Sequence, residues 1–368
     1  MKRVVLMIIT ALTCGMVLTG CDSELATEYN TKNELTVDPN KYDVYVAGHE
    51  ASGQEYSAYY GTDYRNVAKL WNNGVGQNLT DGTRDARATS VFVSGNDVYV
   101  VGYEASGQEY IDNDCVGTQY RYVATVWKNG VAQKLTDGTN THTYAHSVYV
   151  SGSDVYVAGS TGNCAILWKN GVADTLFSAF WGASANSVFV SDNDVYVAGH
   201  SERFSSISAG TTIGSAKLFK NGIEQNLEGR SGNANSVFVF GSDVYLAGTH
   251  TYYAAPIFWE KGVGEYLDDG YGANSVFVSG NDVFVAGSGI GKAVLWKNGI
   301  AQNLTDQMWD VSATSVFVSG SDVFVAGYEC PENGANSVAM LWVNSKAQKL
   351  TNGTHGSMAC SVFVVEKN

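Results

Sequence analysis

Short, wholly apolar runs recur along the chain and alternate with two-residue polar turns. The run "SVFV" starts at Ser90 and returns, with small changes, at Ser147, Ser187, Ser236, Ser275, Ser315 and Ser361. All but the last of these runs lead through "SGND", or a close variant, into a second run of the type "DVYVAG". Runs of about four to eight residues rich in Val, Phe and Tyr and bounded by turn residues predict short β-strands.

Two further segments complete a repeat of four strands. A segment of the type "LWKNG" follows each "DVYVAG", with its aromatic residue at Trp71, Trp127, Trp168, Phe219, Trp259, Trp296 and Trp342, and a looser segment such as "AQNLTDG" comes after it. Gly first in "SGND" favours a type II′ hairpin turn, and Asn-Gly in "KNGV" favours type I′. Each repeat therefore predicts four antiparallel strands in a meander, called A to D in chain order.

The number and the ends of the repeats predict the fold. Strands A and B are apolar on both faces, as expected where each sheet packs between two others. Seven such sheets arranged radially make a seven-bladed β-propeller, which is an all-β fold. The first repeat begins at strand B near Tyr42, and the last supplies only strand A at Ser361. We expect these two parts to complete one blade and close the ring, which also protects the blade edges from aggregation.

The repeat resembles those of bacterial extracellular proteins with short propeller repeats and a "W-x-N-G" element, including many uncharacterised lipoproteins. The resemblance covers about residues 42 to 365. It implies the propeller architecture and says almost nothing about activity. The chain lacks the "GH…WD" pair of WD repeats, the "SxDxGxTW" box of sialidases and the double-glycine strand of kelch repeats. The activities of those families are therefore not expected here.

The first residues predict an export signal. Lys2 and Arg3 precede an apolar run, residues 4–17, which closes on "LTGC" at Cys21. This arrangement resembles the bacterial lipoprotein signal and implies cleavage before Cys21 and a palmitate-type lipid on it. An ordinary secretory signal or an uncleaved anchor is the alternative. The expected parts are a signal peptide (1–20), a lipidated Cys with a flexible stalk (21–41) and the propeller (42–368).

The charge of the mature chain bears on its partners. The chain has 22 basic and 36 acidic residues, and loss of Lys2 and Arg3 leaves 20 basic ones, a net charge of −16. An acidic surface repels phosphate backbones, so we expect no nucleic-acid partner. The lipid anchor implies a place in the bacterial cell envelope, on the outer membrane, with the cell surface and the periplasmic side both open. A single closed ring predicts a monomer.

The two ends of the predicted blades differ. In a meander the A–B and C–D turns lie at one end, here called the plain face, and the B–C and D–A connections lie at the other, here called the loop face. The A–B and C–D turns are uniformly short. Length variation is confined to the loop face, at residues 50–66, 104–122, 201–215 and 330–336 and in the D–A connections. Long connections on a rigid scaffold predict that the loop face carries the function.

The loop face is rich in aromatic residues. Its candidate ligand-binding rings are Trp181, Trp309, Tyr60, Tyr103 and Tyr253. Aromatic side chains supply large contact areas at a low cost in conformational entropy. The alternative interpretation is that these rings hold the long loops onto the propeller. The "LWKNG" aromatics occur once per blade and are expected in the core.

Three loop-face carboxylates form the candidate polar site. Glu50, Glu104 and Glu329 each lie two residues past the strand-B glycine, on blades that are neighbours in the closed ring. Clustered carboxylates could cleave a glycosidic bond or bind Ca²⁺, although solvated loop acids are commoner. The six His come from several blades without a close-spaced pair. The sequence therefore predicts no metal centre, no catalytic residue and no cofactor.

Four cysteines remain for the predicted propeller, namely Cys115, Cys164, Cys330 and Cys360. All lie on the loop face, in an oxidising compartment where disulfides form. We favour pairing Cys115 with Cys164, in connections of adjacent blades, and Cys330 with Cys360, with reduced thiols as the alternative.

These observations leave three hypotheses for the function. The first is a non-catalytic, lipid-anchored binding protein that presents its aromatic loop face to a glycan or a protein. The second is a glycan-cleaving enzyme that uses the Glu50, Glu104 and Glu329 carboxylates. The third is an accessory subunit whose loop face docks onto a membrane complex.

Overall fold

The structure is a computed structural model that describes residues 37–367, apart from 59–60, 111–118, 139–140, 205–211, 230, 307–309 and 332–335. Cys21 and the predicted signal and stalk therefore lie outside the described residues. The described part of the chain holds no helix that is long and apolar enough to cross a bilayer.

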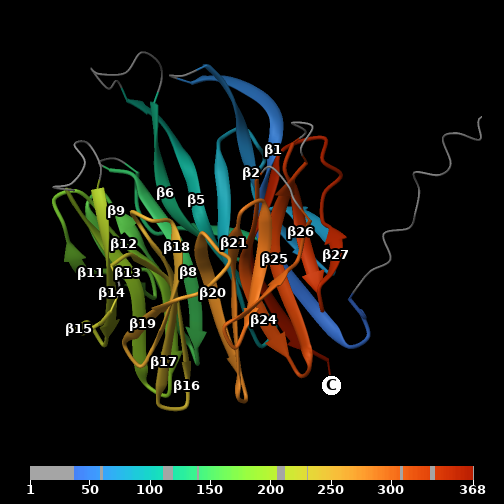
Figure 1. The fold of residues 1–368 in the computed structure, drawn as a ribbon. Coiled ribbons are helices and arrows are strands. Elements are labelled where there is room, and N and C mark those ends of the chain that lie inside the picture. The colour runs from blue at the N-terminus through green and yellow to red at the C-terminus, as the bar shows by residue number, and fades with distance from the viewer. Residues whose placement is uncertain are drawn as a thin grey trace, which may run out of the picture. The chain divides into compact units, whose positions relative to one another are not determined.

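The strands form seven four-stranded antiparallel sheets, called blades I to VII in ring order (Figure 1). Blade I consists of β28 (Ser357–Glu366), β1 (Tyr42–Ala58), β2 (Gly61–Asn72) and β3 (Val75–Asn78). Blade II consists of β4 (Ala86–Ser94), β5 (Asp97–Tyr110), β6 (Gln119–Lys128) and β7 (Val131–Lys134). Blade III consists of β8 (Thr143–Ser151), β9 (Asp154–Thr161), β10 (Cys164–Lys169) and β11 (Val172–Ser178).

The remaining four blades repeat the same strand order. Blade IV consists of β12 (Ala183–Ser191), β13 (Asp194–Phe204), β14 (Thr212–Lys220) and β15 (Ile223–Gln225), and blade V of β16 (Asn233–Phe240), β17 (Asp243–His250), β18 (Ala255–Glu260) and β19 (Val263–Tyr266). Blade VI consists of β20 (Gly272–Ser279), β21 (Asp282–Gly289), β22 (Lys292–Lys297) and β23 (Ile300–Asn303), and blade VII of β24 (Asp310–Ser319), β25 (Asp322–Cys330), β26 (Val338–Val343) and β27 (Lys346–Lys349). The prediction of a seven-bladed β-propeller is confirmed.

The plain-face turns have the predicted geometry. Gly95 opens the A–B turn of blade II with a φ of 59°, as a type II′ turn requires. In the C–D turn of blade I both central residues are left-handed, with φ of 48° at Asn73 and 81° at Gly74, as type I′ requires. Asp192, which replaces the glycine in blade IV, also takes a positive φ of 55°.

The aspartate that opens each strand B is structural. In blade II, Asp97 accepts hydrogen bonds from Asn129 Nδ2 and from Lys128 Nζ, both at 2.7 Å. Asn129 Oδ1 in turn accepts from the backbone N–H of Val98 at 2.8 Å. The same contacts recur in blades III, IV and VI. They tie the two plain-face turns of a blade together, as the interpretation of this Asp as a turn residue requires.

Each blade packs on its neighbours through strand-A and strand-B residues and one aromatic from strand C. Six indoles are almost fully buried, at 0 to 1% exposure: Trp71, Trp127, Trp168, Trp259, Trp296 and Trp342. Phe219 takes the same place in blade IV, at 4% exposure. The prediction that these residues form the core is confirmed.

The serine that opens each strand A links successive blades. The Oγ of Ser90, Ser147, Ser187, Ser236, Ser275, Ser315 and Ser361 each accepts a hydrogen bond of 3.2 to 3.3 Å from a backbone N–H of the next blade. The cycle is complete, because Ser315 accepts from Val362 and Ser361 accepts from Val91. Seven such bonds explain why the repeat retains Ser at this position.

A second cycle is made of aromatic rings from strand A. Phe92, Tyr149, Phe189, Phe238, Phe277, Phe317 and Phe363 contact one another in order, with ring centroids 4.6 to 4.9 Å apart. Phe363, from the C-terminal strand, contacts both Phe317 and Phe92. The two cycles show that β28 completes the ring.

The two ends of the propeller meet in blades I and VII. β28 pairs with β1, as predicted, and the backbone N–H of Lys367 donates to Lys41 O at 2.8 Å. Lys41 Nζ and Tyr42 Oη each lie 2.7 Å from Asp322 Oδ2 in blade VII. These hydrogen bonds, above all the one from Lys41, lower the pKa of Asp322 to about 2. In blade VII the strand-C lysine is replaced by Val343, so Lys41 supplies the cation that Asp322 otherwise lacks.

Candidate binding face

Two of the predicted loops are largely extensions of the blade strands. β1 continues to Ala58 and β5 to Tyr110, and each remains paired with the following strand (Figure 1). Both extensions carry "EASGQEY", in which Gly53 and Gly107 have φ of 75° and 76° at a register shift. This segment lacks a clear alternation of apolar and polar residues, so the sequence did not predict strands there.

Two of the three candidate carboxylates are paired with a lysine of their own blade. Glu50 forms an ion pair with Lys69 of blade I, and both side chains are largely buried. Glu329 is 8% exposed, and its Oε1 lies 3.8 Å from Lys349 Nζ of blade VII. Glu104 lies in β5, opposite Ala86. Two of the three carboxylates thus have a lysine of their own blade as counter-ion, and a shared acid–base site stays a hypothesis.

Among the described residues, no group of three or more His, Cys, Asp or Glu side chains is arranged to hold a metal ion. Burial lowers the pKa of His146 to about 4, and it also lowers the pKa of His200. Both imidazoles are therefore neutral at pH 7. His146 Nε2 lies 3.4 Å from Ser160 Oγ, and His200 Nδ1 lies 3.0 Å from Asn186 Nδ2, so each has a polar partner.

A cysteine and a histidine lie next to each other on the paired strands β28 and β1 of blade I. Cys360 Sγ lies 3.9 Å from His49 Nδ1. Burial and the charge of Arg87 lower the pKa of His49 to about 3, and burial raises the pKa of Cys360 to about 11. Catalytic cysteines need a lowered pKa, because the thiolate is the nucleophile. A neutral thiol beside a neutral imidazole is a packing contact.

The predicted disulfides are only partly within the described residues. Cys164 and Cys360 are thiols in the structure. Cys115 lies outside the described residues, so its pairing with Cys164 stays a prediction. The bond predicted between Cys330 and Cys360 is not formed.

The strand register explains why the second pair is not joined. Cys360 is the bulge residue of β28, the position that Thr314 has in β24. Cys330 lies three residues beyond Gly327, which pairs with Ala313, the neighbour of Thr314. Three strand residues span about 10 Å, whereas a disulfide needs Cα atoms within about 7 Å. The sequence did not show this offset, because it depends on register between blades.

Some loop-face tyrosines pack on one another. The ring of Tyr103 lies 5.1 Å from that of Tyr122 and 4.9 Å from that of Tyr144, between centroids. Tyr122 Oη also donates to Asp85 at 2.9 Å. These contacts join blades II and III. For Tyr103 they favour the interpretation in which the ring stabilises the propeller over the one in which it binds a ligand.

Other rings are open to solvent. Tyr253 is 71% exposed and stacks on His250, with 4.8 Å between ring centroids. Tyr252 packs against Tyr253 at 5.0 Å, and Tyr266 lies 5.9 Å from His250. These four side chains of blade V are called the Tyr platform. The sequence singled out Tyr253 but missed Tyr266, whose place beside His250 comes from the pairing of strands B, C and D.

A second exposed pair lies on the connection from blade III to blade IV. Phe180 and Trp181 are 82% and 49% exposed and contact edge to face at 4.9 Å. Phe180 O accepts from Asn163 Nδ2 at 3.0 Å, which fixes the turn. The other two candidate rings, Tyr60 and Trp309, lie outside the described residues.

Comparison with known proteins adds little beyond the architecture. No family model and no curated protein sequence matches the chain. The chain is similar to the β-propeller domain of the Trilobed protease from Pyrococcus furiosus, with 12% identity, a TM-score of 0.48, and coverage of 84% of this chain and 95% of that one. It is also similar to the acylaminoacyl peptidase of Pyrococcus horikoshii, with 13% identity, a TM-score of 0.43, and coverage of 73% of this chain and 46% of that one. A chain of a nidogen–laminin complex is similar with 7% identity, a TM-score of 0.42, and coverage of 71% of this chain and 92% of that one. The fold assignment rests on the sheet topology.

Proposed function

We propose that this protein is a lipid-anchored, non-catalytic binding protein of the bacterial cell envelope, whose loop face holds a glycan or a protein. The observation that carries the proposal is the Tyr platform. Tyr252 and Tyr253 are 51% and 71% exposed, yet each ring is buttressed by a neighbour. Exposed aromatic rings held in place by stacking give up little entropy when they bind.

The polar contacts bear on the glycan-cleaving alternative. A pair of catalytic carboxylates must face one scissile bond, but Glu50 and Glu329 each face a lysine of their own blade. This pairing favours a binding protein over a glycan-cleaving enzyme. An accessory subunit of a membrane complex would use the same loop face, and it differs from a glycan-binding protein only in what the face captures.

Replacement of Tyr253 by Ala is expected to weaken capture at least about tenfold, because a central aromatic anchor typically contributes ~2 kcal/mol or more. The measurement is binding of the purified protein to a glycan array and to solubilised envelope proteins. The melting temperature should stay within about 1 °C of the parent, since the ring is mostly exposed.

Phe240→Ala is the matched control, because Phe240 is 46% exposed at the plain-face end of β16. It should leave capture unchanged. Equal loss in both variants, or no loss in Tyr253→Ala, would contradict the proposal. Capture of the subunits of a single membrane complex, and of no glycan or other protein, would favour the accessory-subunit alternative.

The anchor is tested separately by Cys21→Ser. Without the acyl chain the protein loses about 0.8 kcal/mol of membrane affinity per methylene, so we expect the variant in the soluble fraction with the parent's melting temperature. Fractionation of the expressing bacterium locates the variant, mass spectrometry of the N-terminal peptide detects the lipid, and circular dichroism during heating gives the melting temperature. Equal membrane retention of variant and parent would show that Cys21 does not carry the anchor.

A further inference from the structure

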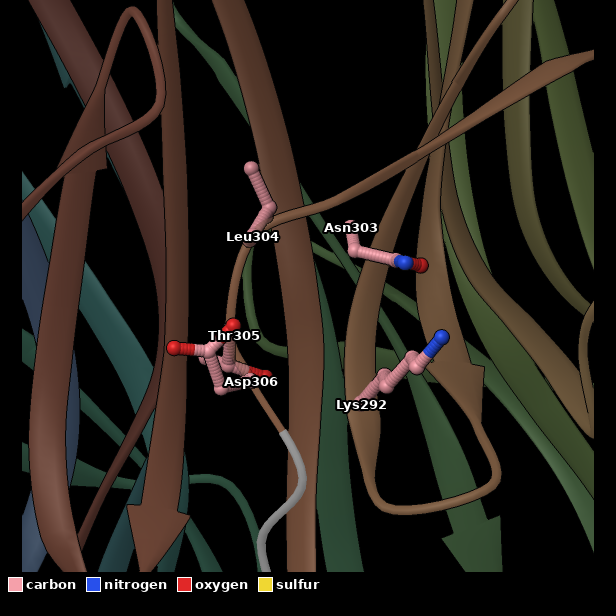
Figure 2. A pocket seen from close by; sticks show the side chains of 5 residues that line it. All are labelled: Lys292, Asn303, Leu304, Thr305 and Asp306. Carbon is pink, nitrogen blue, oxygen red and sulfur yellow. The ribbon is translucent and has the colours of Figure 1, made fainter.

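A pocket of about 500 Å³ lies on the plain face, between blades VI and VII. Its volume is within the range for small-molecule sites, about 300 to 1,000 Å³. Phe284 and Leu295 of blade VI and Val318 of blade VII, all buried, form its apolar part. The chain is described without a break through the turns that border it, whereas the loop-face end of the same blade, shown in Figure 2, adjoins residues 307–309, outside the described residues.

The grooves between the other blades hold a tyrosine ring. In five grooves this ring comes two residues after the strand-B aspartate and packs against the following blade: Tyr45, Tyr99, Tyr156, Tyr196 and Tyr245. Blades VI and VII have phenylalanine at this position. Among the described residues, the apolar cluster between blades VI and VII contains no tyrosine.

The groove between blades VII and I obtains its tyrosine from blade I. The ring of Tyr42 packs edge to face on Phe324, with 5.2 Å between centroids. Tyr42 Oη donates to Asp322 Oδ2 at 2.7 Å and to Ser319 O at 3.2 Å. Tyr42 thus shows how this repeat holds a phenol where strand B carries phenylalanine.

The groove between blades VI and VII keeps the partners of this phenol but lacks the phenol itself. Three residues of blade VI have the places of those that hold Tyr42, and they border the pocket: Phe284, Asp282 and Ser279. The place of Tyr42, directly before the strand-B aspartate, is taken in blade VII by Ser321, which also borders the pocket. A serine side chain is too short to fill the groove, so a pocket lies where the next groove holds a ring.

The outer wall of the pocket departs from the repeat. In the C–D turn of blade VII, Ser345 has the position that is glycine in the other blades, with a φ of 67°. Residues other than glycine rarely adopt this conformation, and strained positions of this kind cluster at functional sites. The hydroxyl of Ser345 accepts a hydrogen bond of 2.9 Å from Gln302 Nε2 of blade VI, which joins the two blades beside the pocket.

The charges at the pocket balance each other. Lys297 Nζ lies 2.7 Å from Asp282 Oδ2, so the pocket favours a neutral ligand. An aspartate with this counter-ion still has room for a phenol. In blade II, Asp97 Oδ2 lies 2.7 Å from Lys128 Nζ and 3.5 Å from Tyr99 Oη.

These contacts select a class of ligand. Phe284 offers an aromatic contact, and ionised Asp282 only accepts hydrogen bonds. An aromatic ring that carries a neutral hydroxyl donor matches both. We propose that the pocket between blades VI and VII binds a phenol, the group that tyrosine carries, as the next groove holds Tyr42. This inference goes beyond the proposed function, because it assigns a separate small-ligand site to the plain face.

The test is ligand-observed NMR on the purified full-length protein, with para-cresol and N-acetyltyrosinamide as probes. At least one should bind with a Kd near ~1 mM, as expected for a small ligand with few contacts. Toluene and N-acetylphenylalaninamide should bind at least about tenfold more weakly, because they lack the hydroxyl that donates to a charged acceptor. Tighter binding of N-acetyltyrosinamide than of para-cresol would assign the pocket to tyrosine in a peptide, and the reverse order to a small phenol.

Ser321→Tyr is the sharpest variant, because it supplies the groove with a ring in the place that Tyr42 has. We expect it to abolish phenol binding without lowering the melting temperature. Ser153→Tyr is the matched control. Ser153 lies in the same turn sequence, "SGSD", and is exposed like Ser321, but it borders a groove that already holds Tyr99. This variant should bind the probes like the parent.

Tyr253→Ala should also leave phenol binding unchanged, so failure of the Tyr platform to capture a partner would not affect this result. Three outcomes would overturn the inference: neither phenol binds, Ser321→Tyr binds the phenols as the parent does, or the probes without the hydroxyl bind as tightly as the phenols.

Discussion

Removal of residues 361–368 is expected to abolish cooperative folding of the ring. The deletion takes away most of β28, in which Val362 and Val364 are 4% and 5% exposed. It also removes Phe363, whose ring lies 4.7 Å from that of Phe92 and 4.9 Å from that of Phe317. Each of these three side chains contributes about 1.5 to 3 kcal/mol on burial, or about 5 to 9 kcal/mol together. The whole stability of a domain is about 5 to 15 kcal/mol.

The control deletion removes the same number of residues, 22–29, from the predicted stalk. The sequence predicts no packing there, so this variant should melt like the parent. Circular dichroism during heating and size-exclusion chromatography compare the three proteins. If the C-terminal deletion stayed monomeric and melted cooperatively near the parent's temperature, the ring would not depend on β28.

Trp342→Ala is expected to destabilise the propeller by about 3 to 5 kcal/mol, the usual cost of truncating a fully buried tryptophan. Trp342 is fully buried and belongs to the apolar cluster between blades VI and VII, with Phe284, Leu295 and Val316. Its removal leaves a cavity that rigid sheets on both sides cannot fill, because their register is set by hydrogen bonds.

Trp181→Ala is the matched control, since it makes the same substitution at a ring that is 49% exposed. Its effect should stay within about 0.5 kcal/mol. Urea unfolding followed by circular dichroism measures both free energies. An equal loss in the two variants would mean that Trp181 is part of the core, and a loss below ~1 kcal/mol at Trp342 would contradict the assignment of the "LWKNG" aromatics to it.

The architecture could be predicted from the sequence because the same strand and turn patterns recur from repeat to repeat. Gly95 and Asn73 lie in turns whose types follow from short sequence motifs. The start at Tyr42 on strand B and the end after strand A predicted that the two ends share a blade, and β28 pairs with β1. Local turn chemistry and periodicity are the signals that a single sequence carries best.

The site was less predictable because its contacts join residues far apart in the chain. Lys41 and Asp322 are 281 residues apart. Lys69 neutralises Glu50 from the neighbouring strand, a pairing that depends on register.

We propose that the loop face, and not the plain face, is the surface that binds the envelope partner. Hydroxyl-radical footprinting of the purified protein, with and without a bacterial cell-envelope preparation, tests it directly. We expect oxidation of Tyr253 and Phe180 to fall when the preparation is present, while oxidation of Phe240 on the plain face is unchanged. Protection of Phe240, with Tyr253 and Phe180 oxidised as before, would contradict it.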